Sequence, residues 1–86
     1  VEKGKPAPDG YLLALRRLNE TEENKISPSE CVVIEDSRWG LEAAIKAGMH
    51  TVAVTNSYKP EELKMAEKIV QRLDTVSIES LKRLCE

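Results

Sequence analysis

Apolar side chains recur at spacings of three and four residues in the first quarter of the chain, at Tyr11, Leu12, Leu15 and Leu18. This spacing places them on one face of an α-helix, the face that packs against a core. The pattern stops in a polar stretch rich in Glu and Asn. We therefore predict an amphipathic helix over about 8–19.

Two later segments are apolar along most of their length and lack a helical or alternating period. The first is Cys31–Ile34 and the second is Thr51–Thr55. Short runs of this kind are typical of strands that have helices on both faces, as in a parallel sheet. They predict parallel strands over about 31–35 and 51–55.

The remaining elements are predicted from capping residues and shorter apolar patterns. Ser37 and Ser77 are suited to accept a hydrogen bond at the start of a helix, and Gly48 is suited to end one. The further expected elements are helices over about 38–48, 60–73 and 77–85 and a short third strand over about 74–76. This order of elements predicts an α/β fold in which right-handed crossovers join parallel strands.

Composition and charge exclude several classes of partner. The 86 residues include 13 Lys and Arg against 15 Asp and Glu, which gives a formal net charge of −2. The basic residues are scattered, so we expect no nucleic-acid partner. No apolar run reaches the ~18–20 residues that cross a bilayer, and no signal peptide begins the sequence, so we expect a cytoplasmic protein without a membrane partner. Cys31 and Cys85 lack metal-ligand spacing and are interpreted as reduced thiols.

The segment Gly4–Asp9 is the first candidate for chemistry. It contains two prolines that stiffen the entry to the first helix, and it places Lys5 beside the N-terminus of that helix. Helix N-termini carry free backbone N–H groups and a partial positive charge, so a phosphate is able to meet both groups there. The alternative is an ordinary helix entry with a solvated lysine.

The second candidate is Glu35-Asp36-Ser37, directly after the first predicted strand. Open α/β sheets bind their ligands at this carboxyl edge. Two adjacent carboxylates repel each other, and a hard cation such as Mg²⁺ relieves that repulsion. The alternative is that one carboxylate caps the next helix while the other faces solvent. Because Ser37 is able to provide the cap, the metal site is favoured.

Taken together, these motifs resemble those of the haloacid dehalogenase superfamily. The Glu-Asp-Ser form is similar to that of its beta-phosphoglucomutase and sugar-phosphate phosphatase branch. The positions that carry the resemblance are Gly4-Lys5-Pro6-Ala7-Pro8-Asp9, Val33-Ile34-Glu35-Asp36-Ser37, Gly40, Ala43-Ala44 and Ala47-Gly48-Met49. The resemblance implies that residues 1–86 form a single partial domain, the C-terminal half of a Rossmann-like core.

The resemblance also implies a reaction and roles for four residues. In this family a phosphoryl group passes from a small phosphorylated substrate to an aspartate and then to water or to a second hydroxyl. Lys5 would be the catalytic lysine that contacts the phosphoryl oxygens, and Asp36 would be a Mg²⁺ ligand. Glu35 would be a second acidic group at the metal, and Ser37 a helper in substrate binding or a helix cap.

The aspartate that receives the phosphoryl group in this family belongs to an Asp-x-Asp pair, and this sequence has no such pair. We therefore expect a fragment of a phosphatase or phosphomutase that is inactive alone. The alternative is a non-catalytic, degenerate module used for binding or interaction. The family places the nucleophile strand beside the strand that ends at Glu35, so we also expect an exposed sheet edge through which the chain self-associates.

Four other residues receive an interpretation from position alone. Tyr11 is interpreted as core packing on the first helix, and His50 as a turn residue. Asn56 lies beyond the second strand, again on the edge at which ligands bind, but loop structure explains it adequately. Trp39 either lines the mouth of the site or shields a helix end.

Overall fold

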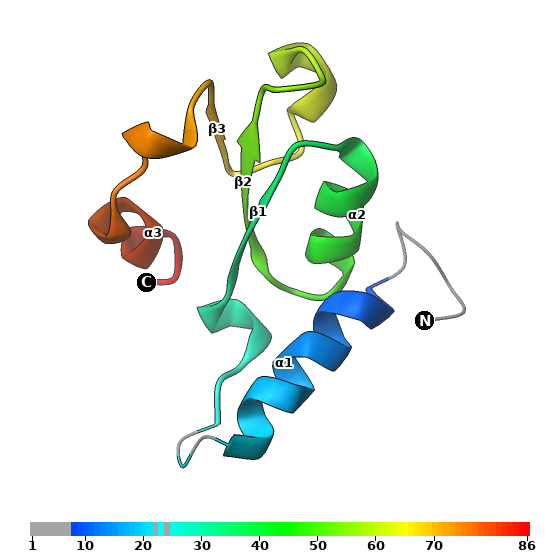
Figure 1. Cartoon of the computed structure of the whole chain (residues 1–86), viewed down its shortest axis with the longest axis vertical. Helices are drawn as coiled ribbons and strands as arrows, with labels where there is room; N and C mark the ends of the chain where they lie inside the picture. Colours follow the sequence, from blue (N-terminus) through cyan, green and yellow to red (C-terminus); the bar gives the residue numbers. More distant parts are fainter. Residues whose placement is uncertain (1–7, 22, 24) are drawn as a thin grey trace.

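The computed structural model describes residues 8–21, 23 and 25–86, so Lys5 lies outside the described residues. Three parallel strands form one sheet in the order β1 (Val32–Glu35), β2 (His50–Val54) and β3 (Lys68–Val70) (Figure 1). Within the described part of the chain, the outer edge of β1 has no neighbouring strand. The expected α/β fold with parallel strands is confirmed.

Helices flank the sheet on two sides (Figure 1). The α-helices are α1 (Asp9–Thr21), α2 (Arg38–Lys46) and α3 (Ile78–Leu84), and the 3₁₀ turns are η1 (Pro28–Glu30), η2 (Pro60–Leu63) and η3 (Leu73–Thr75). Adjacent strand residues point to opposite faces. Accordingly, Val33 packs against the cluster that includes Leu15 of α1, whereas Val32 lines a hollow together with Leu81 of α3.

Two buried clusters hold α1 and α2 against the sheet. The first contains Leu15, Ala47 and Met49, and the second contains Leu41, Ala53 and Leu63. All three members of the second cluster are fully buried, so α2 and the turn η2 are fixed on the same face of β2. This packing holds the carboxyl ends of β1 and β2 in place beside the start of α2.

The predicted helix ends are confirmed in the structure. The Ser37 hydroxyl accepts a hydrogen bond from the Gly40 N–H at 3.1 Å, and Ser77 accepts one from the Ser80 N–H at 3.1 Å. Gly48 has a φ of 79°, a left-handed conformation that glycine adopts without steric cost, just beyond the end of α2. None of the helices in the described part of the chain is long and apolar enough to cross a membrane.

The predictions for the segment after β2 are wrong in two places. The helix expected over 60–73 is a single 3₁₀ turn followed by β3, and the strand expected over 74–76 is largely the 3₁₀ turn η3. The cause is that Lys68–Val70 pairs with Val52–Val54, and this pairing satisfies the backbone groups along the second edge of β2. The Thr55 N–H extends the pairing by donating to the Val70 carbonyl at 3.0 Å.

Candidate functional site

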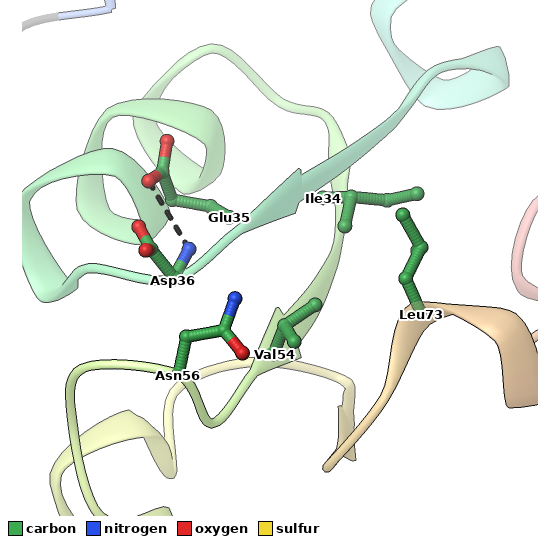
Figure 2. Close-up of a pocket in the computed structure, with 6 residues that line it drawn as sticks. All are labelled: Ile34, Glu35, Asp36, Val54, Asn56 and Leu73. Atoms are coloured by element: carbon green, nitrogen blue, oxygen red, sulfur yellow. Dashed lines mark hydrogen bonds between the residues drawn. The ribbon is translucent and has the colours of Figure 1, made fainter.

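A hollow lies at the carboxyl ends of β1 and β2 (Figure 2), the edge at which open α/β sheets bind ligands. Its volume is about 230 Å³. One part of its lining is polar and comes from the strand ends, and the other part is apolar. The lining residues are Ile34, Glu35, Asp36, Val54, Asn56 and Leu73.

Glu35 ends β1, and its carboxylate is held by hydrogen bonds from two elements. The Tyr11 hydroxyl of α1 donates to Oε2 at 2.9 Å. The Asp36 N–H donates to Oε1 at 3.1 Å, and the Ser37 hydroxyl donates to the same oxygen at 3.3 Å. Glu35 therefore joins α1 to the loop between β1 and α2, and it fixes the conformation of that loop.

Gly40 provides the space that this arrangement needs. A Cβ at this position would lie 2.1 Å from the Glu35 Cδ and 2.2 Å from the Glu35 Oε2. Such distances are far inside van der Waals contact, so the present position of Glu35 requires a residue without a side chain. Sequence similarity pointed to Gly40 without giving this physical reason.

Asp36 differs from Glu35 in the state of its carboxylate. It is partly buried at the rim of the hollow, and its carboxylate accepts no hydrogen bond from any residue that the structure describes. A partly buried carboxylate without a partner is costly unless a cation or water meets it. Of the two adjacent acids, Asp36 is the one whose oxygens are available to a ligand.

The carboxylates at the end of β1 are able to provide part, but not all, of the coordination of a Mg²⁺ ion. The described residues contain no group of three or more His, Cys, Asp or Glu side chains arranged to hold a metal ion. Mg²⁺ is commonly held by one or two protein carboxylates, while waters and substrate phosphate oxygens complete its coordination. Asp36, with Glu35 beside it, matches that requirement.

The consecutive residues Glu35, Asp36 and Ser37 lie at the end of β1 and the start of α2, and each has different hydrogen-bond partners. Ser37 caps α2 and also donates to Glu35. Tyr11 packs against the first core cluster as predicted, but its hydroxyl bond to Glu35 was missed. The available signal was that a half-buried tyrosine hydroxyl needs a polar partner. Trp39 is 56% exposed.

Two positions after the first strand were interpreted incorrectly or incompletely. His50 is the first residue of β2 and not a turn residue, and its Nδ1 lies 2.8 Å from the Glu67 carboxylate. Asn56 lines the hollow, although it had been explained by loop structure alone. The sequence already places Asn56 on the ligand edge, because neighbouring parallel strands end at the same edge, but it does not show that the residue lines a hollow with Glu35 and Asp36.

Two residues with shifted pKa values, Glu30 and Cys31, lie near the other end of β1, away from the hollow. Hydrogen bonds from the Ser27 backbone and hydroxyl lower the pKa of Glu30. Burial raises the pKa of the Cys31 thiol, and nearby Cys85 and Glu30 raise it further. Cys31 is therefore a protonated, half-buried thiol at neutral pH, and it forms no disulfide bond in the structure.

Comparisons with known proteins point to one family. Hexitol phosphatase A of Escherichia coli is 32% identical over 78 residues, which are 91% of this chain and 33% of that protein. The chloroplastic 5-amino-6-(5-phospho-D-ribitylamino)uracil phosphatase of Arabidopsis thaliana is 36% identical over 86 residues, which are 100% of this chain and 21% of that protein. This chain therefore spans a third or less of the length of these two relatives.

A solved structure agrees with the sequence comparisons. The crystal structure of a HAD hydrolase, family IA, variant 3, from Entamoeba histolytica has a TM-score of 0.82 and 31% sequence identity. The match covers 96% of this chain and 36% of that one. The model of the haloacid dehalogenase-like hydrolase family matches residues 1–48, which contain Glu35, Asp36 and Ser37. The chain belongs to the haloacid dehalogenase-like hydrolase family.

Proposed function

We propose that these 86 residues form part of a Mg²⁺-dependent phosphatase or phosphomutase that acts on a small phosphorylated sugar or sugar-like compound. The observation that carries the proposal is the unpartnered, partly buried carboxylate of Asp36 at the carboxyl edge of the sheet. Both relatives described above have names that state a phosphatase activity on a small phosphorylated molecule, which supports the substrate class.

In this proposal the two acidic residues have different tasks. Asp36 holds the cation, and Glu35 holds the loop that positions Asp36, since the oxygens of Glu35 accept hydrogen bonds from Tyr11 and from the loop itself. When bound, Mg²⁺ offsets the negative charge of the phosphoryl group and orients it for in-line attack. Lys5, outside the described residues, would contact the phosphoryl oxygens.

The covalent step needs a group that this sequence does not contain. No two aspartates stand two residues apart, because the only aspartates are Asp9, Asp36 and Asp74. We propose that the nucleophile and the aspartyl-phosphate intermediate belong to another part of a longer protein, and that the 86 residues alone do not hydrolyse phosphate esters. The same observation favours the second candidate function, a non-catalytic binding module.

The substitution Asp36→Asn tests the cation-binding role in the 86-residue chain itself. It removes the charge of the available carboxylate with almost no change in shape. Removing one charge close to a divalent cation at the protein surface is expected to cost about tenfold or more in Mg²⁺ affinity. The affinity is measured by following backbone amide signals in NMR spectra during a MgCl₂ titration.

Asp74→Asn is the matched control, because it makes the same chemical change at an exposed carboxylate that pairs with Arg72 at 2.7 Å. This control is expected to keep the Mg²⁺ affinity of the parent chain. Equal Mg²⁺ affinity in the parent chain and Asp36→Asn would rule out the role proposed for Asp36.

Two measurements distinguish the enzyme part from the non-catalytic module. Incubation of the 86-residue chain with Mg²⁺ and a generic phosphomonoester is expected to release no phosphate, and release of phosphate would contradict the proposed inactivity. The reading frame ahead of Val1 then decides between the candidates. An encoded Asp-x-Asp strand supports the enzyme part, whereas a frame without one supports the non-catalytic module.

A further inference from the structure

Asn56 is the one polar residue of the hollow that the proposed function leaves unused. It follows β2 in a tight turn, in which its backbone N–H donates to the Val54 carbonyl at 3.0 Å. Its side-chain amide makes no hydrogen bond with any described residue. Loop asparagines commonly bond to their own backbone nearby, and this one does not.

The position of Asn56 places an amide donor beside the proposed cation site. Figure 2 shows Asn56 and Asp36 at the adjoining ends of β2 and β1, with the Asn56 Nδ2 pointing toward the segment that joins Glu35 to Asp36. The carboxylates accept hydrogen bonds and attract cations, whereas the amide NH₂ donates. One hollow of about 230 Å³ therefore contains both a group that attracts a cation and a group that donates a hydrogen bond to an anion.

An anion that shares a cation with Asp36 would meet both groups. Mg²⁺ bound through one or two carboxylates usually completes its coordination with substrate phosphate oxygens. A second oxygen of the same phosphate would then face the neighbouring strand end, where Asn56 lies. Ile34, Val54 and Leu73 form the apolar part of the hollow, and of these Val54 is buried whereas Ile34 and Leu73 are exposed. Next to the buried Val54, a hydrogen bond to a charged oxygen is stronger than in open water.

We propose that Asn56 is a substrate-binding residue whose side-chain amide donates a hydrogen bond to a phosphoryl oxygen. This inference rests on the proposed function, because it needs the cation at Asp36 to bring the phosphate into the hollow. The two roles concern opposite charges. Asp36 binds the cation, whereas Asn56 contacts the phosphate and gains its hydrogen bond only when phosphate is bound together with the cation.

The side-chain amide signals of the 86-residue chain test the proposal directly. The chain has only three asparagines and one glutamine, so four pairs of NH₂ signals are expected. In the presence of Mg²⁺, addition of inorganic phosphate should shift the Asn56 pair in a saturable manner. Asn19 is the internal control, because its amide already donates to the Ile26 carbonyl at 2.9 Å and its signals should stay in place.

Two variants at position 56 are expected to change the affinities for Mg²⁺ and for phosphate in different ways. Asn56→Asp replaces the donor by a negative acceptor, so Mg²⁺ affinity should rise while phosphate affinity in the presence of Mg²⁺ should fall about tenfold or more. Asn56→Ala should lower phosphate affinity and leave Mg²⁺ affinity unchanged. The exposed neighbour Ser57 provides the control Ser57→Ala, which should change neither affinity.

The outcomes separate this inference from the proposed function. If Mg²⁺ and phosphate shift the backbone signals around Asp36 while the Asn56 amide signals and the affinities of both variants stay unchanged, the role of Asn56 is refuted and the proposed function stands. If neither Mg²⁺ nor phosphate shifts any signal near Asp36, both are refuted. Because Asn56 is exposed, its variants should fold, and circular dichroism verifies this.

Discussion

Gly40 lies in the first turn of α2, under the side chain of Glu35. A Cβ added at Gly40 would clash with the Glu35 side chain. That side chain is not free to move, because Tyr11, Asp36 and Ser37 donate hydrogen bonds to it. Either Glu35 breaks those bonds or the start of α2 moves away from β1. At the scale of one residue, the position of the candidate metal ligand Asp36 thus depends on the absence of a neighbouring side chain.

The substitution Gly40→Ala is expected to lower the free energy of unfolding by about 1–3 kcal/mol, the usual cost of forcing an extra group into a packed site. Urea denaturation followed by circular dichroism measures it. Gly10→Ala is the control, because a Cβ at Gly10 in α1 meets nothing within 4 Å. Gly10→Ala should raise the free energy of unfolding by about 0.5–1 kcal/mol, because alanine favours the helix more than glycine does.

A second variant separates the clash from a general effect on α2. Combining Gly40→Ala with Glu35→Ala removes the side chain that the new methyl group would hit. The destabilisation by Gly40→Ala should then largely disappear in the Glu35→Ala background, a non-additivity typical of residues in contact. Simple addition of the two losses would contradict the assigned contact.

At the scale of elements, the side chain of Glu67 adds to the backbone pairing that joins β2 and β3. The Glu67 carboxylate contacts the His50 Nδ1 at 2.8 Å and accepts a hydrogen bond from the Thr51 N–H at 3.2 Å. In return, the Glu67 N–H donates to the Thr51 hydroxyl at 3.1 Å. Thr51 is only 1% exposed, so these bonds satisfy polar groups that water does not reach.

We expect Glu67→Ala to cost about 1–3 kcal/mol of folding free energy, because the substitution leaves the Thr51 N–H without its acceptor. Hydrogen exchange at the Thr55 amide, which donates to the Val70 carbonyl, should become faster as β3 loosens. Glu61→Ala at an exposed position of η2 is the control and should change stability by less than about 0.5 kcal/mol. Unchanged exchange at Thr55 in Glu67→Ala would show that β3 is held by its backbone pairing alone.

The same segment marks the limit of prediction from the sequence. β1 and β2 were predictable because each is a run of several consecutive apolar residues, although only β2 is largely buried and Ile34 of β1 is 40% exposed. β3 was not predictable, since it is only three residues long, is partly exposed and begins with the charged residue Lys68. The helical spacing that suggested 60–73 joins Leu63 of η2 to Val70 of β3, and these residues occupy different elements.

The candidate site was predictable in part for a similar reason. The place of Glu35 and Asp36 followed from the end of an apolar strand. The different hydrogen bonding of the two carboxylates did not, because it depends on a contact from Tyr11, which is 24 residues from Glu35 in the sequence. Local patterns do not contain contacts of that range.

At the scale of the whole molecule, the chain is less compact than a typical domain of its length. The radius of gyration is 13.0 Å, against about 12 Å for a compact domain of this length. The outer edge of β1 is unpaired within the described residues, and Ile34 next to it is 40% exposed. Unpaired apolar edges associate with other strands. We propose that the isolated 86-residue chain self-associates through β1.

Ile34→Lys tests this proposal, since a lysine on an edge strand opposes strand pairing. Sedimentation velocity over a range of concentrations should show association of the parent chain and a monomer for Ile34→Lys. Leu18→Lys on α1, where Leu18 is 55% exposed, makes the same change away from the edge and should associate like the parent chain. Equal association of the two lysine variants would place the contact elsewhere.

The bond from Tyr11 to Glu35 also sets a condition for transplanting this loop into a designed protein. A graft of residues 35–37 alone would carry the acids without the parts that orient them. The smallest transferable unit includes Tyr11 on one helix and Gly40 on another, with β1 between the two helices in the sequence. A host scaffold must therefore offer two helices on the same side of a strand before it is able to accept the three-residue motif.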